Sequence, residues 1–212
     1  METKDLTSTI YLDIETGYGL PPSQDGIVPD GRLKDPEKIK VDIEEKWKKA
    51  WHTQSLHSIK GELWCIGIAV NDDEAMCFRG EDERGTMILL DDFLADTRYD
   101  RIIAHNGIEF DFLWLFHKGI KYKLKNVVHT FGKNNQLVDT MRIMDGPAWK
   151  KMVSLNNMAE LLGIKGKAGI DGSMVPQMIL DGKHKEIIEY CKEDVNILRK
   201  CYKALNELGL YS

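Results

Sequence analysis

Three clusters of carboxylates lie far apart in the chain, and each stands beside apolar residues typical of the edge of a core. They are Asp13-Ile14-Glu15-Thr16, the segment from His105 to Asp111, and Tyr190-Cys191-Lys192-Glu193-Asp194. Divalent cations such as Mg²⁺ prefer oxygen ligands, so a site for two of them beside a phosphate needs several carboxylates from different segments. Such a pair can supply a nucleophilic hydroxide, a clamp on the phosphate and stabilisation of the leaving oxygen. Metal-assisted phosphodiester chemistry is therefore the leading hypothesis.

The first cluster lies on a predicted strand. Over residues 8–15 apolar and polar residues alternate, which is the period of a strand and points Asp13 and Glu15 to the same side. Further strands are expected over 63–70, 75–79, 101–104 and 137–140, and the first two of these should form a hairpin.

The second and third clusters lie on predicted helices. The strand over 101–104 runs into His105-Asn106-Gly107, after which a helix should begin with Asp111 in its first turn. The positive end of that helix would stabilise a carboxylate by roughly 0.3–1 kcal/mol. An amphipathic helix over 184–208 places Tyr190 and Asp194 one turn apart, so both side chains project to the same side.

A turn-rich stretch over 17–35 and a helix over 36–52 indicate an insertion at about 17–60. Asp35 followed by Pro36 is a good helix start, and Trp47 and Trp51 recur at a spacing that favours packing rather than base stacking. A short helix after Ser154 and a loop over 163–172, rich in glycine and lysine and therefore expected to be mobile and basic, precede the last helix.

The composition is that of an ordinary globular protein, with 212 residues, 42% hydrophobic and 30% charged. This length fits one domain, 1–212, including the insertion. No apolar run approaches a membrane span and the start lacks the layout of a signal peptide, so we expect a cytoplasmic protein that contacts no membrane. The net charge of −5 argues against a protein that coats nucleic acid. The cysteines include no C-x-x-C pair and suggest buried, reduced thiols rather than a zinc ribbon or disulfides.

Taken together, the motifs resemble a known family. D-x-E on a strand, H-N-x-x-x-F-D at a helix start and Y-x-x-x-D on a late helix are similar to the DnaQ-like 3′-to-5′ exonucleases with tyrosine in the third motif (DEDDy). The related histidine branch has its histidine five residues before the last aspartate, where this chain has Glu189. The resemblance spans most of the chain and is strongest to the exonuclease domains of family B DNA polymerases, here expected to stand alone.

The resemblance implies an α/β, ribonuclease-H-like fold, with a mixed central sheet flanked by helices. It implies that Asp13 bridges two Mg²⁺ or Mn²⁺ ions, and that Tyr190 orients the attacking water. The remaining metal ligands would be Glu15, Asp111 and Asp194.

The resemblance also implies two residues that bind the substrate. Thr16 would contact the 3′-terminal nucleotide, and Asn106 would support the substrate near Asp111.

The function expected on these grounds is the release of nucleoside 5′-monophosphates from the 3′ end of single-stranded nucleic acid, with DNA preferred over RNA. A separate DNA polymerase is a possible partner, with proofreading as the associated role. Two alternatives stay open: an RNA-trimming exoribonuclease of the ribonuclease D type, and a non-catalytic, polymerase-accessory nucleic-acid-binding module on the same fold.

Several nearby residues have a simpler interpretation. Asp139 at a strand end is typical of a turn or hydrogen-bonding residue, and His105 of a satisfied core or supporting histidine. Glu109 adds an acid that the motif does not require and is interpreted as a solvated residue at the helix start. Lysines between 118 and 167, above all those over 150–167, could guide a phosphate backbone, and Trp149 could stack on a base.

Overall fold

A five-stranded mixed sheet is the centre of the fold in the computed structural model, which describes residues 8–133, 136–146, 148, 152–167 and 169–210. The strand order is β3-β2-β1-β4-β5. β1 runs antiparallel to β2 and parallel to β4, while β3 pairs antiparallel with β2 and β5 parallel with β4. The strands are β1 (Ser8–Gly17), β2 (Glu62–Val70), β3 (Met76–Phe78), β4 (Tyr99–Ala104) and β5 (Leu137–Asp139).

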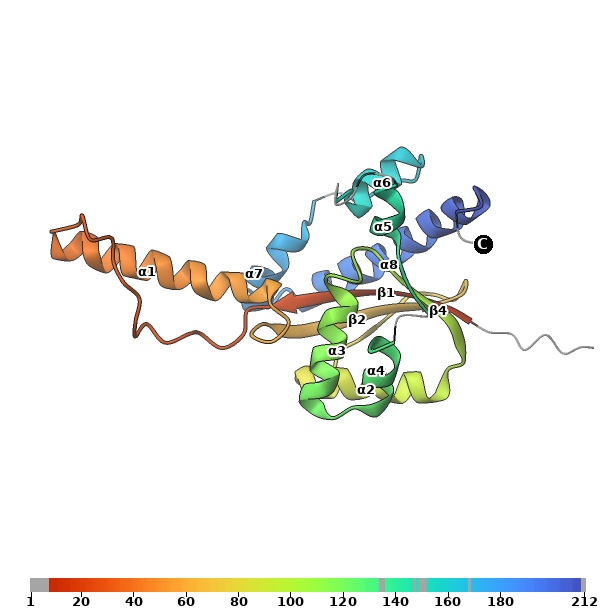
Figure 1. The fold of residues 1–212 in the computed structure, drawn as a ribbon, viewed down its shortest axis with the longest axis horizontal. Coiled ribbons are helices and arrows are strands. Elements are labelled where there is room, and N and C mark those ends of the chain that lie inside the picture. Colours follow the sequence, from red (N-terminus) through yellow and green to blue (C-terminus); the bar gives the residue numbers. More distant parts are fainter. Residues whose placement is uncertain (1–7, 134–135, 147, 149–151, 168, 211–212) are drawn as a thin grey trace, which may run out of the picture.

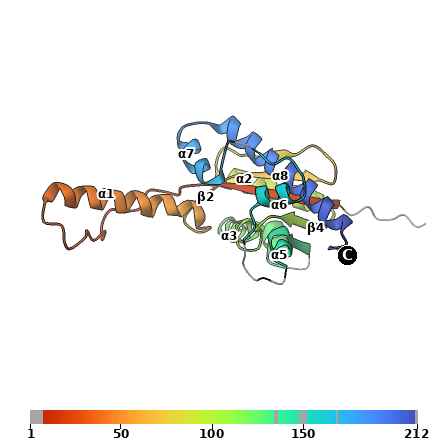
Figure 2. The same cartoon turned by 90° about the horizontal axis from the view of Figure 1, so that it is seen from above.

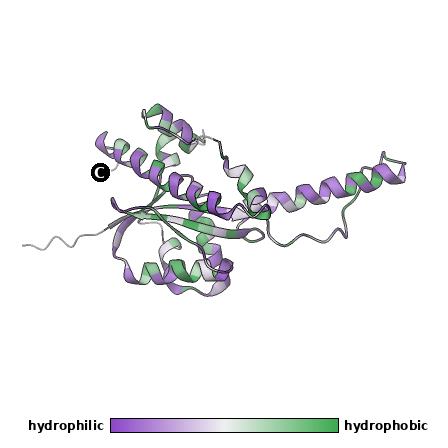
Figure 3. Ribbon diagram, turned by 180° about the vertical axis from the view of Figure 1, so that it is seen from behind, coloured by the Kyte–Doolittle hydropathy of each residue, from purple (hydrophilic) through white to green (hydrophobic). Residues whose placement is uncertain are grey.

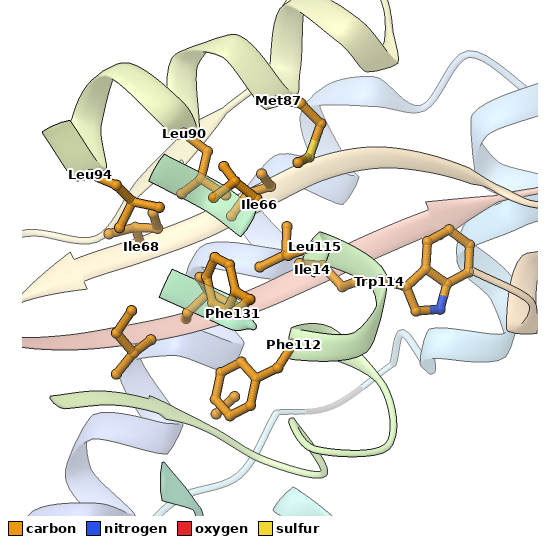
Figure 4. Packing of buried hydrophobic residues seen from close by; sticks show 14 of the residues in the cluster. Ile14, Ile66, Ile68, Met87, Leu90, Leu94, Phe112, Trp114, Leu115 and Phe131 are labelled. Atoms are coloured by element: carbon orange, nitrogen blue, oxygen red, sulfur yellow. The ribbon is translucent and has the colours of Figure 1, made fainter. Parts of the chain in front are cut away.

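One face of the sheet is covered by α2 (Glu83–Asp96), α3 (Asp111–Tyr122) and α4 (Lys125–Phe131). The alternation along β1 sends Ile10, Leu12 and Ile14 to this face, where all three are buried. Figure 4 shows the cluster that they join with side chains of β2 and of these helices, and burial of each large apolar side chain contributes about 1.5–3 kcal/mol.

The opposite face is covered by α8 (His184–Glu207) and α7 (Val175–Leu180). Figure 2 shows these two helices on one side of the sheet and α3 on the other. Figure 3 shows hydrophilic residues on the outer side of α8, as an amphipathic helix requires. Among the described helices, none has the length and apolar character that a membrane span needs. Asp13 and Glu15 alternate with the core residues of β1, so they face α8.

The segment between β1 and β2 forms an arm that projects from the body (Figure 1). Its helix α1 (Pro36–His52) begins as predicted, with the Asp35 side chain accepting the Glu37 N–H, and it buries no residue. The Trp47 and Trp51 indoles donate to the carbonyls of Pro22 and Gly19, at 2.7 and 2.8 Å, which confirms that both tryptophans pack within the arm. A short 3-10 turn, η1 (Thr53–Leu56), leads back to the sheet.

The elements differ from the predicted ones at a few places. Thr140, expected in a strand, begins α5 (Thr140–Met144), because the Asp139 side chain caps that helix through the Met141 N–H. Helices α2, α4 and α7 were not predicted. The remaining elements are α6 (Leu155–Leu161), which Ser154 caps as expected, and the 3-10 turn η3 (Gly172–Met174).

Candidate active site

β1 carries the first pair of acids toward α8. Glu15 is buried and Asp13 partly buried. Burial raises the pKa of both carboxyls well above the usual range, and the nearby charge of Asp194 raises each pKa further. The two side chains, with the Cys191 thiol, place a potential ligand atom each within 4.8 Å of one another. These two carboxyl groups at the end of β1 are therefore costly to ionise unless a cation binds beside them.

Asp111 joins the first pair from the other face of the sheet. It is the first residue of α3, as predicted, and it is buried. Its Oδ1 accepts the backbone N–H of Ile14, the residue between Asp13 and Glu15, at 3.1 Å. This hydrogen bond fixes the start of α3 against β1. Burial raises the pKa of Asp111 to about 7, although the backbone hydrogen bonds oppose this shift.

α8 contributes Tyr190 and Asp194, one turn apart and both buried. Burial raises the pKa of Asp194. Burial also raises the pKa of Tyr190, and the charge of Asp194 raises it further. The Tyr190 phenol therefore stays protonated and can donate a hydrogen bond. Asp194 Oδ1 is buried and has no hydrogen-bond partner among the described residues.

These carboxylates fit divalent cations. The pKa of Asp13 is raised first by burial and then by the charges of Asp194, Glu15 and Asp111, so the four groups lie close enough to repel one another. Oxygen donors from three segments are the set that Mg²⁺ and Mn²⁺ prefer, and the unpartnered Asp194 Oδ1 is a donor that the protein itself leaves unused. The structure thus brings together the five predicted catalytic residues; their individual roles stay predictions.

Lys167 is a member of this site that sequence reasoning did not single out. Its Nζ donates to Asp194 Oδ2 and lies 3.3 Å from the centroid of the Tyr190 ring. The lysine side chain is only 8% exposed. The only sequence signal was its place in the glycine- and lysine-rich loop over 163–172, where a solvated or backbone-binding role was as reasonable. Its ammonium offsets part of the negative charge of Asp13, Glu15 and Asp194.

We expect Lys167→Met to lower the stability of the metal-free protein by about 1.5–3 kcal/mol, the worth of a hydrogen bond to a charged group. Mg²⁺ should reduce this loss, since bound cations would offset the same carboxylates. Urea unfolding in EDTA and in Mg²⁺ measures both effects. Lys165→Met, at an exposed lysine of the same loop, is the matched control and should change stability by less than about 0.5 kcal/mol. An equal loss in the two variants would contradict this assignment.

The two predicted substrate-binding residues are held by the fold. Thr16 is buried, and its Oγ1 donates to the Ser55 carbonyl at 2.7 Å, so its hydroxyl ties η1, at the end of the arm, to β1. Asn106 has a φ of 62°, and its N–H donates to Asp139 Oδ1 at 2.9 Å. Contact of either residue with a substrate stays a prediction.

The supporting residues behave as their simpler interpretation predicted. Asp139 also accepts the Ile108 N–H at 3.1 Å, so it shapes the turn before α3. His105 is satisfied by Thr140 Oγ1 at 2.8 Å and the Val153 carbonyl at 2.7 Å, so both of its ring nitrogens have hydrogen-bond partners. Glu109 pairs with Arg142 at 2.5 Å.

The lysine predictions have mixed outcomes. Lys118 is buried, 1% exposed, and pairs with Glu83, so its assignment to a phosphate-guiding surface was wrong. Lys165 is exposed and stays a candidate for backbone contact. Lys150, Lys151 and Trp149 lie outside the described residues.

Comparison with known proteins agrees with this geometry. Residues 75–198, more than half of the chain, match a family model described as a predicted 3′-5′ exonuclease related to the exonuclease domain of PolB. The matched segment contains Asp111, Tyr190 and Asp194, whereas Asp13 and Glu15 precede it. No curated protein matches the chain.

Among solved structures, the family B DNA polymerase of the hyperthermophilic archaeon Pyrobaculum calidifontis matches with a TM-score of 0.64 and 18% identity. The match covers 94% of this chain and 24% of the polymerase. At this identity the likeness concerns the fold, which is the ribonuclease-H-like α/β arrangement expected above.

Proposed function

Since the chain belongs to the family of predicted 3′-5′ exonucleases related to the exonuclease domain of PolB, we propose that it releases nucleoside 5′-monophosphates from the 3′ end of single-stranded DNA with the aid of two divalent cations. The observation that carries the proposal is the convergence of Asp13, Glu15, Asp111 and Asp194, with one carboxylate oxygen of Asp194 buried and unpartnered. If the cluster were purely structural, we would expect the repulsion among the four carboxylates to be compensated and Asp194 Oδ1 to have a hydrogen-bond partner.

The chain's own residues then have distinct tasks. Asp13, Glu15, Asp111 and Asp194 would hold the cations, and the rigid elements that carry them fix the spacing of the donors. Tyr190, whose phenol stays protonated, would donate to or orient the water that attacks the phosphorus. Bound here, two divalent cations would supply a nucleophilic hydroxide and stabilise the charge on the phosphate and leaving oxygen.

DNA is the proposed polymer because the family is related to the exonuclease domain of PolB. We propose that the chain acts on the 3′ ends that a separate DNA polymerase leaves, with proofreading as the associated role. The alternative polymer is RNA, because the proposed roles of the carboxylates and Tyr190 concern the cations, the attacking water and the phosphate, and do not depend on the sugar. A contact to the 2′ position is what would separate the two.

The test is metal-dependent digestion of a 5′-labelled, single-stranded DNA oligonucleotide. We expect a ladder of products shortened from the 3′ end, with 5′-mononucleotides released, complete loss of activity in EDTA, and recovery in excess Mg²⁺ or Mn²⁺. An RNA strand of the same sequence, digested in parallel, should be degraded at least about tenfold more slowly, a difference of roughly 1.4 kcal/mol in the barrier.

Each rival has its own outcome in this assay. Faster digestion of the RNA strand would favour the exoribonuclease. Binding of the oligonucleotide without any metal-dependent release of nucleotides would favour the non-catalytic module and would rule out the proposed function.

A further inference from the structure

Three of the four cysteines converge from three separate elements. Cys65 lies on β2, Cys77 on β3 and Cys191 on α8, and their Sγ atoms all lie within 4.8 Å of one another. All three are free thiols. Cys65 and Cys191 are fully buried, whereas Cys77 is partly exposed on the edge strand of the sheet. The group therefore has a buried interior and one open side.

Gly67 makes the space in which the thiols meet. It is the register partner of Cys77 in the β2–β3 pair, and it lies two residues after Cys65, on the same face of β2. A Cβ at this position would come within 2.8 Å of Cys191 Sγ, so only the missing side chain allows α8 to bring its thiol down to the sheet.

We propose that Cys65, Cys77 and Cys191 form a binding site for one thiophilic divalent cation of the Zn²⁺ class. Thiolates select soft cations, whereas the neighbouring carboxylates select Mg²⁺ or Mn²⁺, so the two sites differ in the metal that they take. Tetrahedral zinc with bonds of about 2.3 Å separates its sulfur ligands by about 3.8 Å, which the present spacing allows with small side-chain adjustments. Binding releases the thiol protons to solvent.

The exposure of the three thiols sets the side from which a cation can reach them. Cys77 is partly exposed on the edge strand of the sheet, whereas Cys65 and Cys191 are buried. A cation arriving from the edge of the sheet would therefore meet Cys77 first, and the two buried thiols would complete the site.

Cys191 connects this site to the carboxylates. Its Sγ lies 3.7 Å from Asp13 Oδ2, and Asp13, Glu15 and Cys191 also hold their potential ligand atoms within 4.8 Å of one another. A cation on the three thiolates would recruit Asp13 as its fourth ligand and draw this carboxylate away from the oxygen-ligand site. Occupation of the thiol site should thus inhibit DNA hydrolysis, a consequence that rests on the proposed function, whereas the binding itself does not.

Titration of the reduced, full-length protein with Cd²⁺, in excess Mg²⁺, tests the binding. We expect ultraviolet thiolate-to-cadmium charge-transfer absorption that saturates at one ion per chain and that Mg²⁺ does not suppress. Cys77→Ser should weaken binding by at least about 100-fold, since it removes a ligand outright. Cys201→Ser, at the buried fourth cysteine on α8, is the matched control and should bind as the wild type does.

Two results would overturn the site: absence of the absorption in the folded wild type, or equal binding by the Cys77→Ser and wild-type proteins. The effect on activity is read separately. Equimolar Zn²⁺ should inhibit digestion by the wild type and by Cys201→Ser but spare Cys77→Ser. A wild type that binds Cd²⁺ through its thiols yet never digests DNA in Mg²⁺ would refute the proposed function and leave the thiol site standing.

Discussion

Asp13→Asn is expected to lower the rate of DNA digestion by about 10³-fold or more and to leave the fold intact. Burial raises the pKa of Asp13, and the charges of Asp194, Glu15 and Asp111 raise it further, so this acid lies at the centre of the charge that the cations would offset. Asparagine keeps the shape but removes the charge, and a loss of about 4 kcal/mol of transition-state stabilisation corresponds to this factor.

The same substitution should not destabilise the metal-free protein. Asp13 is desolvated and repelled by its neighbours, so its removal relieves a cost that is present only when the cations are absent. We therefore expect the thermal midpoint of Asp13→Asn in EDTA to equal or exceed that of the wild type. A lower midpoint would mean that Asp13 has a structural role that the structure does not reveal.

Initial rates on the 5′-labelled oligonucleotide measure the catalytic effect. Glu109→Gln is the matched control, because it removes an acid close to Asp111 that pairs with Arg142 instead of joining the four carboxylates. Its rate should stay within about threefold of the wild type. If Asp13→Asn digested DNA as fast as this control, the assignment of the site would be wrong.

The parts of the site that follow local periodicity could be predicted from the sequence. The alternation along 8–15 placed Asp13 and Glu15 on one side of a strand, and the structure shows that side facing α8. The strand-turn-helix pattern placed Asp111 in the first turn of α3, and the helical period placed Tyr190 and Asp194 together. Each of these positions depends only on residues within one or two turns.

The positions that depend on tertiary contacts could not be predicted in this way. Lys167 reaches Asp194 across 27 residues of chain, and nothing in its own loop distinguishes it from Lys165. The thiols of Cys65, Cys77 and Cys191 meet only because β3 pairs with β2 and α8 crosses both, a contact that sequence spacing does not encode.

Helix α2 is different, because its signals were present in the sequence. Asp82 caps it by accepting the Gly85 N–H at 2.7 Å, and Met87, Leu90 and Leu94 recur at helical spacing and are buried. Gly85 in the first turn and the exposed apolar residues Ile88 and Leu89 blur the pattern.

The first residue of α2 leads to the second large effect: Glu83→Gln is expected to destabilise the protein by roughly 3 kcal/mol. Glu83 Oε1 accepts from the Leu63 N–H at 2.7 Å and from Lys118 Nζ at 2.6 Å, while Oε2 accepts from Lys121 and Tyr122. Lys118 is 1% exposed, so the substitution leaves a buried ammonium without its counter-charge, a loss typically of about 3–5 kcal/mol.

The size of this effect should depend on pH. Burial alone would raise the pKa of Glu83, but the hydrogen bonds from Lys118, Lys121 and Tyr122 outweigh burial and lower it. A lowered pKa contributes stability that is fully present above the unfolded value, about 4.3, and that is lost as pH falls through the folded value. The wild type and Glu83→Gln should therefore differ most near neutral pH and approach each other below about pH 4.

Urea unfolding from pH 7 to pH 3 measures this difference, with Glu81→Gln, an exposed acid two residues earlier, as the control that should stay within about 0.5 kcal/mol. Adding Lys118→Met to Glu83→Gln should restore part of the loss, because the unpaired charge is then gone. Lys118 lies on α3, whose first residue is Asp111. The Glu83→Gln variant should therefore also make the position of the Asp111 carboxylate less fixed. A double variant no more stable than Glu83→Gln would show that the cost does not come from the buried ammonium.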